Sequence, residues 1–302
     1  MDLSRPLALL TDARYLQPQP GNAYVENIFL EDALLMASLQ PMGYQVIRMH
    51  WDDPACNWGQ MLAAVFRTTW DYFHRFNEFR SWLQRIRGQT RLINSGEVVE
   101  WNMNKNYLAE LQHQGIAIPP TCFVAAGSED TLEEIINKFG WEEVILKPAV
   151  SGAARHTYRF AAADAAWHEE VFRELLRKES LLVQQFQPSV LDRGEAALMF
   201  FDGRFSHAVL KRARPGDFRV QDDFGGTVHP YQPAAEEIEL ARQALQCSPQ
   251  PPVYGRVDLL WDEAGRPLVS ELELIEPELW LRCSEPAAAL FANALYKALQ
   301  SS

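Results

Sequence analysis

Three carboxylates near the C-terminus have the spacing that points most directly to chemistry. They lie in the segment VYGRVDLLWDEAGRPLVSELELIEP (253–277), whose two apolar runs predict a β-hairpin. Side chains alternate between the faces of a strand, so Glu271 and Glu273 share one face, and Asp258 joins them if the strands pair in the simplest register. Carboxylates this close repel each other, so a cation should lie between them, and oxygen ligands without His or Cys suit Mg²⁺. The alternative interpretation is a solvent-facing polar strand face with Arg256 as a local salt-bridge partner.

A lysine followed by a loop of small residues is the second chemical feature. Lys147 ends the apolar run 144–146, and the loop SGAARHT (151–157) follows shortly afterwards. A lysine at a strand end, beside a loop with free backbone N–H groups, is a common arrangement for holding nucleotide phosphates. The loop has Gly152 as its single glycine and matches neither the Walker A pattern nor GxGxxG, so an exposed lysine before an ordinary loop is the alternative.

Two more polar segments follow along the chain. The first is QQF (184–186) at the end of an apolar run, with Glu195 just before the next apolar run. The second, KRARPGDFR (211–219), has four basic residues in nine positions and precedes the glycine pair 225–226. A basic run in an acidic chain meets an anionic partner or is simply solvated, and solvation is the commoner explanation.

The segment FRTTWDYF (66–73) follows an apolar run that predicts a strand of a parallel sheet. Ligands of parallel sheets bind beyond the carboxyl ends of the strands, so the segment is a candidate substrate contact. Arg67 is suited to holding a carboxylate and Asp71 an amine, with Trp70 and Tyr72 beside them. Aromatic packing between domains, with an Arg–Asp surface pair, is the alternative.

The composition limits the classes of protein that fit. Of the 302 residues 47% are hydrophobic and 23% are charged, which is typical of globular proteins and argues against disorder. The formal net charge of −12 makes general binding to nucleic acid or an anionic membrane unfavourable, and no apolar stretch is long enough to span a bilayer. Four scattered cysteines without a CxxC pair predict reduced thiols in a cytoplasmic protein.

The predicted elements that position these residues fall into three groups. Alternating strands and helices in the first hundred residues predict a Rossmann-like parallel sheet. Its strands are expected at 7–10, 44–49, 62–66 and 91–94, and its helices at 31–39 and 73–86. The middle of the chain should contain helices at 102–113, at 132–139 (capped by Ser128 or Asp130) and at 165–177, and strands at 123–124, 144–147, 157–160 and 181–186. The last third should form hairpins at 196–210 and 253–275 and a final helix from about residue 285, with Ser284 as its N-cap.

The order of these features resembles the ATP-grasp superfamily, in particular its glutathione-synthetase-like branch. The segments FRTTWDYF, WNMNKNYL (101–108), GDFRVQDDFGG (216–226) and ELELIEP (271–277) are similar to the cyclo-ligases that form cycloserine from O-ureido-serine. The resemblance implies an α/β (α+β) ATP-grasp fold in three parts. These are an N-terminal Rossmann-like substrate domain (1–98), a central lid subdomain (99–187) and a C-terminal catalytic subdomain with an antiparallel sheet (188–302).

The resemblance also implies a role for individual residues. Lys105, on a helix, and Lys147 would contact the phosphates of ATP, and the loop with Ser151 and Gly152 would close over them. The expected contacts to the adenosine are Gln184, Gln185 and Phe186 for adenine and Glu195 for the ribose. Two Mg²⁺ ions, replaceable by Mn²⁺, would be held by Asp258, Glu271 and Glu273. Arg219, and with weaker support Arg256, would steady the transferred phosphoryl group. Two departures from the family are the glycine-poor loop and Glu273, where glutathione synthetases have Asn.

The implied activity is that of an ATP- and Mg²⁺-dependent carboxylate–amine ligase acting on a small amino-acid-like substrate, with ring closure within one molecule as one form. Its partners would be that small molecule and neither nucleic acid nor membrane, and a homodimer is compatible with it. Gly225 and Gly226 would bring backbone N–H groups near the substrate, or form a plain turn. An inactive ATP-binding sensor or scaffold, and a ligase with a thiol or peptide acceptor, are the alternatives. The seven histidines form no motif, and His207, in a predicted strand, is the one worth testing.

Overall fold

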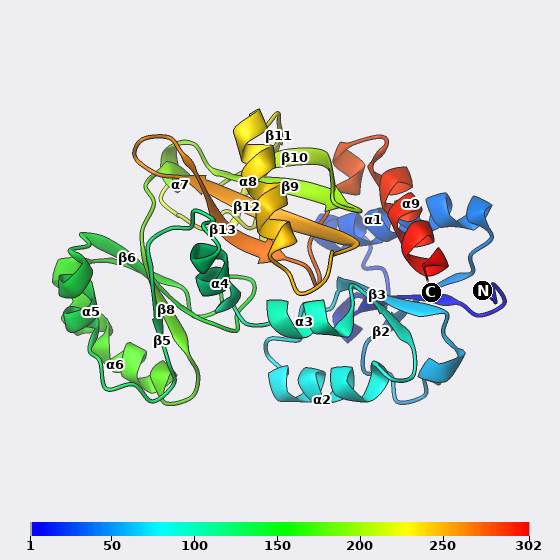
Figure 1. Cartoon of the computed structure of the whole chain (residues 1–302), viewed down its shortest axis with the longest axis horizontal. Helices are drawn as coiled ribbons and strands as arrows, with labels where there is room; N and C mark the ends of the chain where they lie inside the picture. The colour runs from blue at the N-terminus through cyan, green and yellow to red at the C-terminus, as the bar shows by residue number, and fades with distance from the viewer. Residues whose placement is uncertain (1, 302) are drawn as a thin grey trace.

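The N-terminal part of the chain forms the parallel sheet that the sequence predicts. The computed structural model describes residues 2–301, and Figure 1 shows their three sheets around a common centre. The first sheet has the order β2-β1-β3-β4 with all pairs parallel. Its strands are β1 (Leu7–Thr11), β2 (Val46–His50), β3 (Ala63–Thr68) and β4 (Arg91–Ile93). Its helices are α1 (Ala23–Leu39), α2 (Phe76–Ile86) and α3 (Gly96–Asn102). Every residue of β1 and β3 is buried, as expected for a parallel sheet covered on both faces.

Helix α1 begins eight residues before the position predicted from the sequence. Asn22 caps it by accepting a hydrogen bond from the backbone N–H of Val25. The helix buries two acidic residues, Glu31 and Asp32, together with its apolar ones. Buried charges interrupt the apolar stripe, so the hydrophobic pattern did not show the full helix.

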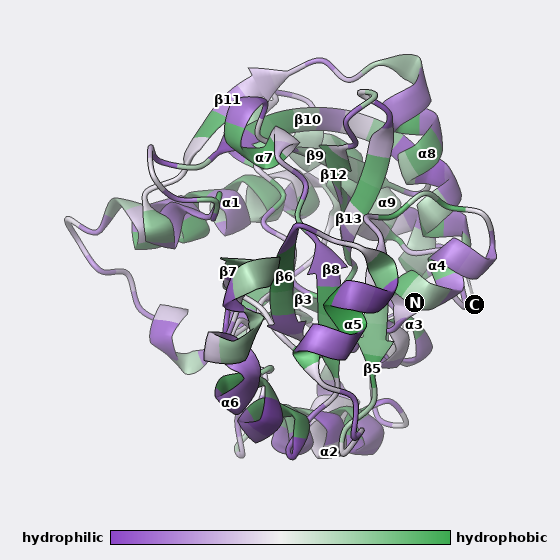
Figure 2. Ribbon diagram, turned by 90° about the vertical axis from the view of Figure 1, so that its left-hand side faces the viewer, coloured by the Kyte–Doolittle hydropathy of each residue, from purple (hydrophilic) through white to green (hydrophobic). Residues whose placement is uncertain are grey.

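The middle sheet is antiparallel, has the order β5-β8-β6-β7, and is covered on one face by two helices. Figure 2 shows hydrophilic residues on the outer side of these helices and hydrophobic residues on the strands behind them. Thr131 caps α5 in a capping box with Glu134, so the cap is neither Ser128 nor Asp130. The strands are β5 (Thr121–Val124), β6 (Glu143–Pro148), β7 (Tyr158–Ala161) and β8 (Leu181–Gln185), and the helices α5 (Leu132–Phe139) and α6 (Ala165–Leu176).

The helix predicted over 102–113 is divided into two in the structure. Helix α3 ends at Asn102, and α4 (Tyr107–His113) begins after a turn that contains Lys105. Lys105 is therefore not on a helix, and its backbone N–H instead donates to the carbonyl of Ala149, at 2.7 Å. The turn places the lysine side chain beside the loop that follows β6.

The third sheet is antiparallel with the order β11-β10-β9-β12-β13. Both predicted hairpins are present in it. Its strands are β9 (Glu195–Phe201), β10 (Arg204–Arg212), β11 (Thr227–Tyr231), β12 (Tyr254–Trp261) and β13 (Pro267–Glu273). The remaining helices are α7 (Ser189–Asp192), α8 (Ala235–Gln246) and α9 (Ala287–Gln300). The sequence analysis missed α8, although Ile238, Ala241 and Leu245 recur at helical spacing, and it placed the N-cap of α9 at Ser284 where Pro286 occupies it.

The first and third sheets share one core and several polar ties. Phe291 of α9 packs in one cluster with Leu7 of β1 and Leu35 of α1, so the C-terminal helix covers the N-terminal sheet. The side chain of Asn102 donates to the carbonyl of Leu272 at 3.0 Å and accepts from the N–H of Leu274 at 2.8 Å. The expected boundary after residue 98 falls inside α3, so the division into 1–98, 99–187 and 188–302 stays a prediction. Among residues 2–301, the structure has no helix with both the length and the apolar character needed to cross a membrane.

Candidate active site

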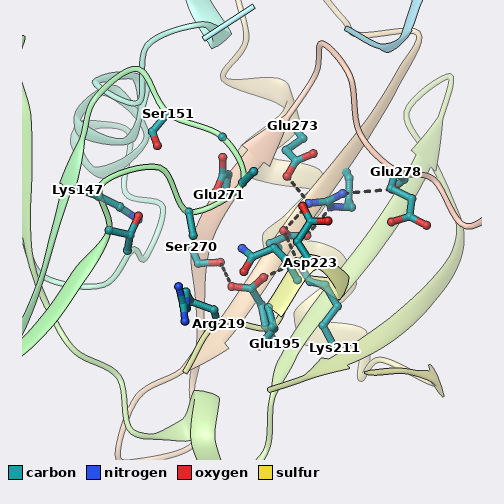
Figure 3. A pocket seen from close by; sticks show the side chains of 18 of the residues that line it. Lys147, Ser151, Glu195, Lys211, Arg219, Asp223, Ser270, Glu271, Glu273 and Glu278 are labelled. Atoms are coloured by element: carbon teal, nitrogen blue, oxygen red, sulfur yellow. Dashed lines mark hydrogen bonds and ion pairs between the residues drawn. The ribbon is translucent and has the colours of Figure 1, made fainter. Parts of the chain in front are cut away.

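A cleft of about 320 Å³ lies where the three sheets meet, within the usual size range of small-molecule sites. Figure 3 shows Glu195, Glu271 and Glu273 around one space, with Lys147 and Ser151 to one side of it. Most of the residues predicted from the sequence line this cleft: Trp70, Tyr72, Lys105, Lys147, Ser151, Gly152, Gln184, Gln185, Phe186, Glu195, Arg219, Arg256, Asp258, Glu271 and Glu273. The packing of the three sheets therefore brings residues that are distant in the sequence into one site.

The β12–β13 hairpin pairs in the register that the sequence analysis assumed. Asp258 lies opposite Glu271, and Arg256 lies opposite Glu273, with a register shift only after Asp258. All four line the cleft, so the polar face of the hairpin is directed into it. The three carboxylates do converge on one face, and that face lines the cleft instead of the outer surface, but Arg256 is the local salt-bridge partner that the alternative interpretation named.

The cations between these carboxylates are side chains of the protein itself. Arg256 donates from Nε and Nη2 to the two oxygens of Asp258, at 2.8 and 2.9 Å, and also contacts Glu273. Lys211 Nζ lies 2.7 Å from Asp258 Oδ2 and pairs with Glu195 as well. Lys105 pairs with Glu271. The repulsion that the sequence analysis identified is thus relieved by lysine and arginine.

This arrangement bears directly on the predicted metal site. Within residues 2–301, no group of three Asp, Glu, His or Cys side chains is arranged to hold a metal ion. Each of the three predicted ligands instead contacts Lys or Arg. The donor set itself, carboxylate oxygens without nitrogen or sulfur, remains one that suits Mg²⁺.

Burial and ion pairing move the pKa values of neighbouring carboxyls in opposite directions. Burial alone would raise the pKa of Asp258, but Arg256 and Lys211 outweigh it and hold the value at about 2. Burial raises the pKa of Glu273 to about 7, with Arg256 offsetting only part of the effect. Burial, and then the charge of Glu273, raise the pKa of Glu276 well above its usual range. Carboxyls whose pKa values are driven apart are typical of catalytic sites.

One end of the cleft combines lysines with an apolar wall. Lys105 Nζ donates to the carbonyl of Ser151 at 2.8 Å, and Lys147 Nζ lies 3.3 Å from Oε1 of Gln184. Burial lowers the pKa of Lys147. Beside them Ile145, Phe186, Val190 and Val220 form an apolar cluster, the setting expected for a flat base next to a phosphate chain.

The loop after β6 is held close to the N-terminal domain. Ala153, Ala154 and His156 have positive φ, and Arg155 forms a 2.6 Å ion pair with Glu179. A methyl group at residue 152 would lie 2.5 Å from Cε1 of Phe73, so a larger residue there would have to displace the ring or the loop. Phe73 belongs to FRTTWDYF, so the predicted lid loop contacts the predicted substrate segment directly.

Some predicted residues are positioned away from the reacting centre. Asp71 is absent from the lining of the cleft, because it accepts hydrogen bonds from Trp51 Nε1 at 2.7 Å and Arg75 Nη1 at 3.0 Å. Gly225 and Gly226 are absent from the lining too. A methyl group on Gly226 would lie 2.1 Å from the carbonyl oxygen of Val220, so the plain turn explains the glycine pair.

The two predicted arginines Arg219 and Arg67 are each bonded to an aspartate of the protein. Arg219 lines the cleft but pairs with Asp217 at 2.7 Å, a bond that holds the pKa of Asp217 well below its usual range. Arg67 is only 2% exposed, and its Nε donates to Asp32 at 3.0 Å. It lines a small side pocket of the cleft and not the cleft itself.

Several lining residues were not found from the sequence. Lys211 was noted only as part of a basic run, and Asp222 and Asp223 lie inside GDFRVQDDFGG without a role. Tyr24, Glu276 and Glu278 also line the cleft. The sequence does signal the acidic pair and Glu276, through the two motifs that carry the resemblance, but it has no local signal for Tyr24.

Comparison with known proteins identifies the class first. Residues 7–94 match the family model of the N-terminal domain of D-cycloserine synthetase DcsG. The ATP-grasp ligase PsnB, in a structure with a variant precursor, Mg and ADP, has a TM-score of 0.64 at 14% identity, covering 98% of this chain and 99% of that one. This likeness, together with the three sheets around one cleft, defines an ATP-grasp fold.

Two relatives with more than 30% sequence identity show which family the chain belongs to. The chain is 33% identical over 283 residues to the cycloserine biosynthesis protein DcsG of Streptomyces lavendulae, covering 88% of this chain and 93% of that protein. The crystal structure of D-cycloserine synthetase DcsG has a TM-score of 0.83 at 31% identity, covering 97% of this chain and 99% of that one. The chain belongs to the DcsG family, and it is an ATP-dependent ligase that forms C–N bonds.

Proposed function

We propose that this ligase acts through an acyl-phosphate and closes a ring within one small amino-acid-like molecule, with O-ureido-serine as the substrate. The observation that carries the proposal is the convergence of Asp258 and Glu271 with Lys105, Lys147 and Arg256 in one cleft. Relation to a cycloserine biosynthesis protein supports the choice of substrate.

The chemistry needs two displacements. A substrate carboxylate oxygen attacks the γ-phosphorus of ATP, and ADP leaves. The ureido nitrogen bonded to the side-chain oxygen then attacks the acyl carbon, phosphate leaves, and the nitrogen loses a proton. The ring nitrogen still carries the carbamoyl group, so one water must cleave that C–N bond, releasing carbamate as carbon dioxide and ammonia, to give cycloserine. Both displacements ask the protein mainly to position charge and to stabilise it.

The chain's own residues have assignable roles in these steps. Lys105 and Lys147 would balance the charge of the phosphates, and Gln184 to Phe186, beside the apolar cluster, would hold adenine. Glu195 would meet the ribose. Arg256, among the carboxylates, would steady the acyl-phosphate, and Arg219 would reach the transferred group when it leaves Asp217.

Magnesium is the implied metal, and the oxygen donors fit it. Asp258, Glu271 and Glu273 would hold two ions, with Mn²⁺ as a substitute, once phosphates compete for Lys105 and Arg256. When bound, Mg²⁺ neutralises charge on the β- and γ-phosphate oxygens. The four cysteines are free, which is consistent with work in the reducing cytoplasm. A homodimer stays a prediction that the mass in solution tests.

The experiment that tests this function is ADP release from ATP and Mg²⁺ with D- or L-O-ureido-serine, in the presence and absence of hydroxylamine. We expect ADP release that depends on the substrate, cycloserine as the product, and a hydroxamate when hydroxylamine intercepts the acyl-phosphate. ADP release without hydroxamate would argue against the acyl-phosphate. ATP binding without ADP release would favour the sensor or scaffold, and release only with an added thiol or peptide would favour the other acceptors.

A further inference from the structure

The backbone of loop 151–157, which is expected to close over the phosphates, is bent by residues other than glycine. Ala153, Ala154 and His156 have φ values of 47°, 54° and 48°. Positive φ brings the Cβ of an L-residue close to the following carbonyl oxygen, whereas glycine adopts it without this cost. Gly152, the single glycine of the loop, lies outside this region of φ. Other contacts must therefore hold the loop in its shape.

Arg155 supplies these contacts from the middle of the loop. Its guanidinium donates to the two oxygens of Glu179, at 3.1 and 2.6 Å, and to the carbonyl of Val150 at 3.1 Å. Its backbone N–H donates to the carbonyl of Gly152 at 3.0 Å, and its own carbonyl accepts from Ser151 Oγ at 2.9 Å. The side chains of Arg155 and Glu179 are only about one-fifth exposed. A bidentate pair of this kind fixes the orientation of both groups.

The partner of Arg155 belongs to the framework of the middle sheet. Glu179 lies between α6 and β8, next to Ser180, whose carbonyl accepts from the N–H of Ala149 at 2.8 Å. That bond joins the chain just before β8 to the chain just after β6, where the loop begins. The ion pair therefore ties the middle of the loop to the same place as its base.

The guanidinium acts on the loop from the side away from the cleft. Arg155 and His156 are absent from the lining of the cleft. The other five loop residues line it: Ser151, Gly152, Ala153, Ala154 and Thr157. Figure 3 shows Ser151 beside the cleft, near Lys147. Any effect of Arg155 on a ligand in the cleft must therefore pass through the backbone of the loop.

We propose that Arg155 is a positioning residue, which through its pair with Glu179 holds loop 151–157 in the shape that receives the phosphates of ATP. The pair does here what several glycines do in a glycine-rich loop, so it accounts for the single glycine of this one. The proposal rests on the proposed function, which assigns the phosphates to this end of the cleft.

The first test measures ADP release by Arg155→Ala, Glu179→Gln and the double variant. We expect Arg155→Ala to raise the KM for ATP about tenfold, while the KM for O-ureido-serine stays constant. Glu179→Gln should raise the KM for ATP as well, and the double variant should be no worse than Arg155→Ala, because one pair carries both effects. Arg155→Lys should recover only part of the loss, since lysine keeps the charge but not the bidentate contact.

The matched control is an exposed ion pair of the same subdomain. Lys178 and Glu174 lie 2.9 Å apart, and Lys178→Ala and Glu174→Gln should match the wild type. An unchanged KM for ATP in Arg155→Ala would overturn the proposal. A normal KM in Glu179→Gln beside a raised one in Arg155→Ala would mean that the arginine meets the phosphates directly. A rise of both KM values with a lower unfolding midpoint would mean a general structural role, and either result would also overturn the proposal.

A second test asks whether the pair takes the place of glycines. Ala154→Gly removes the strain of a positive φ, so adding it to Arg155→Ala should lower the KM for ATP about threefold. In the wild-type background, Ala154→Gly should leave the KM for ATP nearly unchanged, because the pair already holds the loop. No recovery in the double variant would overturn the proposal.

A binding measurement separates failure of this proposal from failure of the proposed function. If the wild type releases no ADP with O-ureido-serine, the proposed function is wrong, but ATP and Mg²⁺ alone still probe the loop. They should raise the unfolding midpoint of the wild type and of Lys178→Ala more than that of Arg155→Ala, whereas the three midpoints without ligand should be nearly equal. Equal shifts with ATP, or no shift in any of the three proteins, would reject the role of Arg155.

Discussion

The two ends of the cleft differ in how their charged side chains are paired. The nucleotide end is the part around Asp258, Glu271 and Glu273, and the substrate end is the part beside the N-terminal sheet, near Asp222 and Arg67. At the nucleotide end, Asp258, Glu271 and Glu273 each contact a lysine or arginine of the protein. At the substrate end, Asp222 lacks an ion pair and Arg67 keeps an unpaired N–H among the described residues. Buried charges are costly unless they are paired, so the half-buried and buried carboxylates of the nucleotide end are balanced by the protein's own cations, whereas Asp222 is exposed and needs no ion pair because water solvates it. Under the proposed function, phosphates would compete for the lysines and arginines of the nucleotide end, whereas a ligand could reach the exposed Asp222 without breaking an ion pair.

The largest effect is expected for a variant at the nucleotide end, Glu271→Gln, measured as ADP release. Glu271→Gln removes a carboxylate opposite Asp258, and we expect ADP release to fall about 10²- to 10³-fold. The unfolding midpoint should change little, because the variant loses the Lys105 pair but also a like-charge repulsion. Glu263→Gln, in the exposed loop of the same hairpin, is the matched control for ADP release and midpoint. Normal turnover of Glu271→Gln would refute the metal assignment.

The next effect separates the two ends from each other. Lys147→Ala removes a cation from the nucleotide end only, so we expect the KM for ATP to rise about tenfold or more while the KM for the substrate stays nearly constant. Lys138→Ala, in α5 of the same subdomain, should leave both unchanged. Equal losses for both substrates would mean that the two ends are not independent and that Lys147 is not a phosphate contact.

A smaller effect is expected where the lid loop meets the N-terminal domain. Gly152→Ala places a methyl group against the Phe73 ring, so we expect the KM for ATP to rise about fivefold as the loop shifts. Adding Phe73→Leu should restore much of the loss by making room. Gly88→Ala, where no atom lies within 4 Å of the added methyl, serves as the control. Failure of the double variant to recover would show that the loop–ring contact does not position the lid.

The smallest effect concerns the support behind the substrate end. Nε2 of His207 lies 2.9 and 3.1 Å from the carbonyl oxygens of Leu279 and Trp280, next to Glu278. Burial lowers the pKa of His207 from 6.5, so below that pH the unfolded chain takes up its proton more readily than the folded protein. The contribution of His207 to the free energy of unfolding should therefore fall as the pH drops below about 6.5. Above that pH, the contribution should be constant.

His207→Gln isolates that contribution from the other titrating groups. We expect the variant to lose less stability than the wild type between pH 7 and pH 5 in thermal or urea unfolding. His113→Gln, at an exposed position on α4, should follow the wild type. A steeper pH dependence in His207→Gln would mean that the histidine is charged in the folded protein.

The parts of the site predicted from the sequence are those that local structure determines. Helix α5 was placed within its observed bounds because its apolar residues recur at helical spacing, and the hairpin register followed from its two apolar runs. Lys105 was assigned to a helix because the pattern over 102–113 does not show the turn that interrupts it. That turn is stabilised by the carbonyl of Ala149, a contact between distant segments, so no local pattern records it.

The amino-acid sequence by itself determined the acidic face of the β12–β13 hairpin, because a strand alternates its side chains with a period of two. Only the tertiary structure decided which cations meet that face. Lys211 and Asp258 are 47 residues apart in sequence, and Lys105 and Glu271 are 166 apart. The side pocket joins Tyr24, Arg67, Asp222 and Glu278 in the same way. Side chains this far apart meet through the packing of three sheets, which no local periodicity encodes.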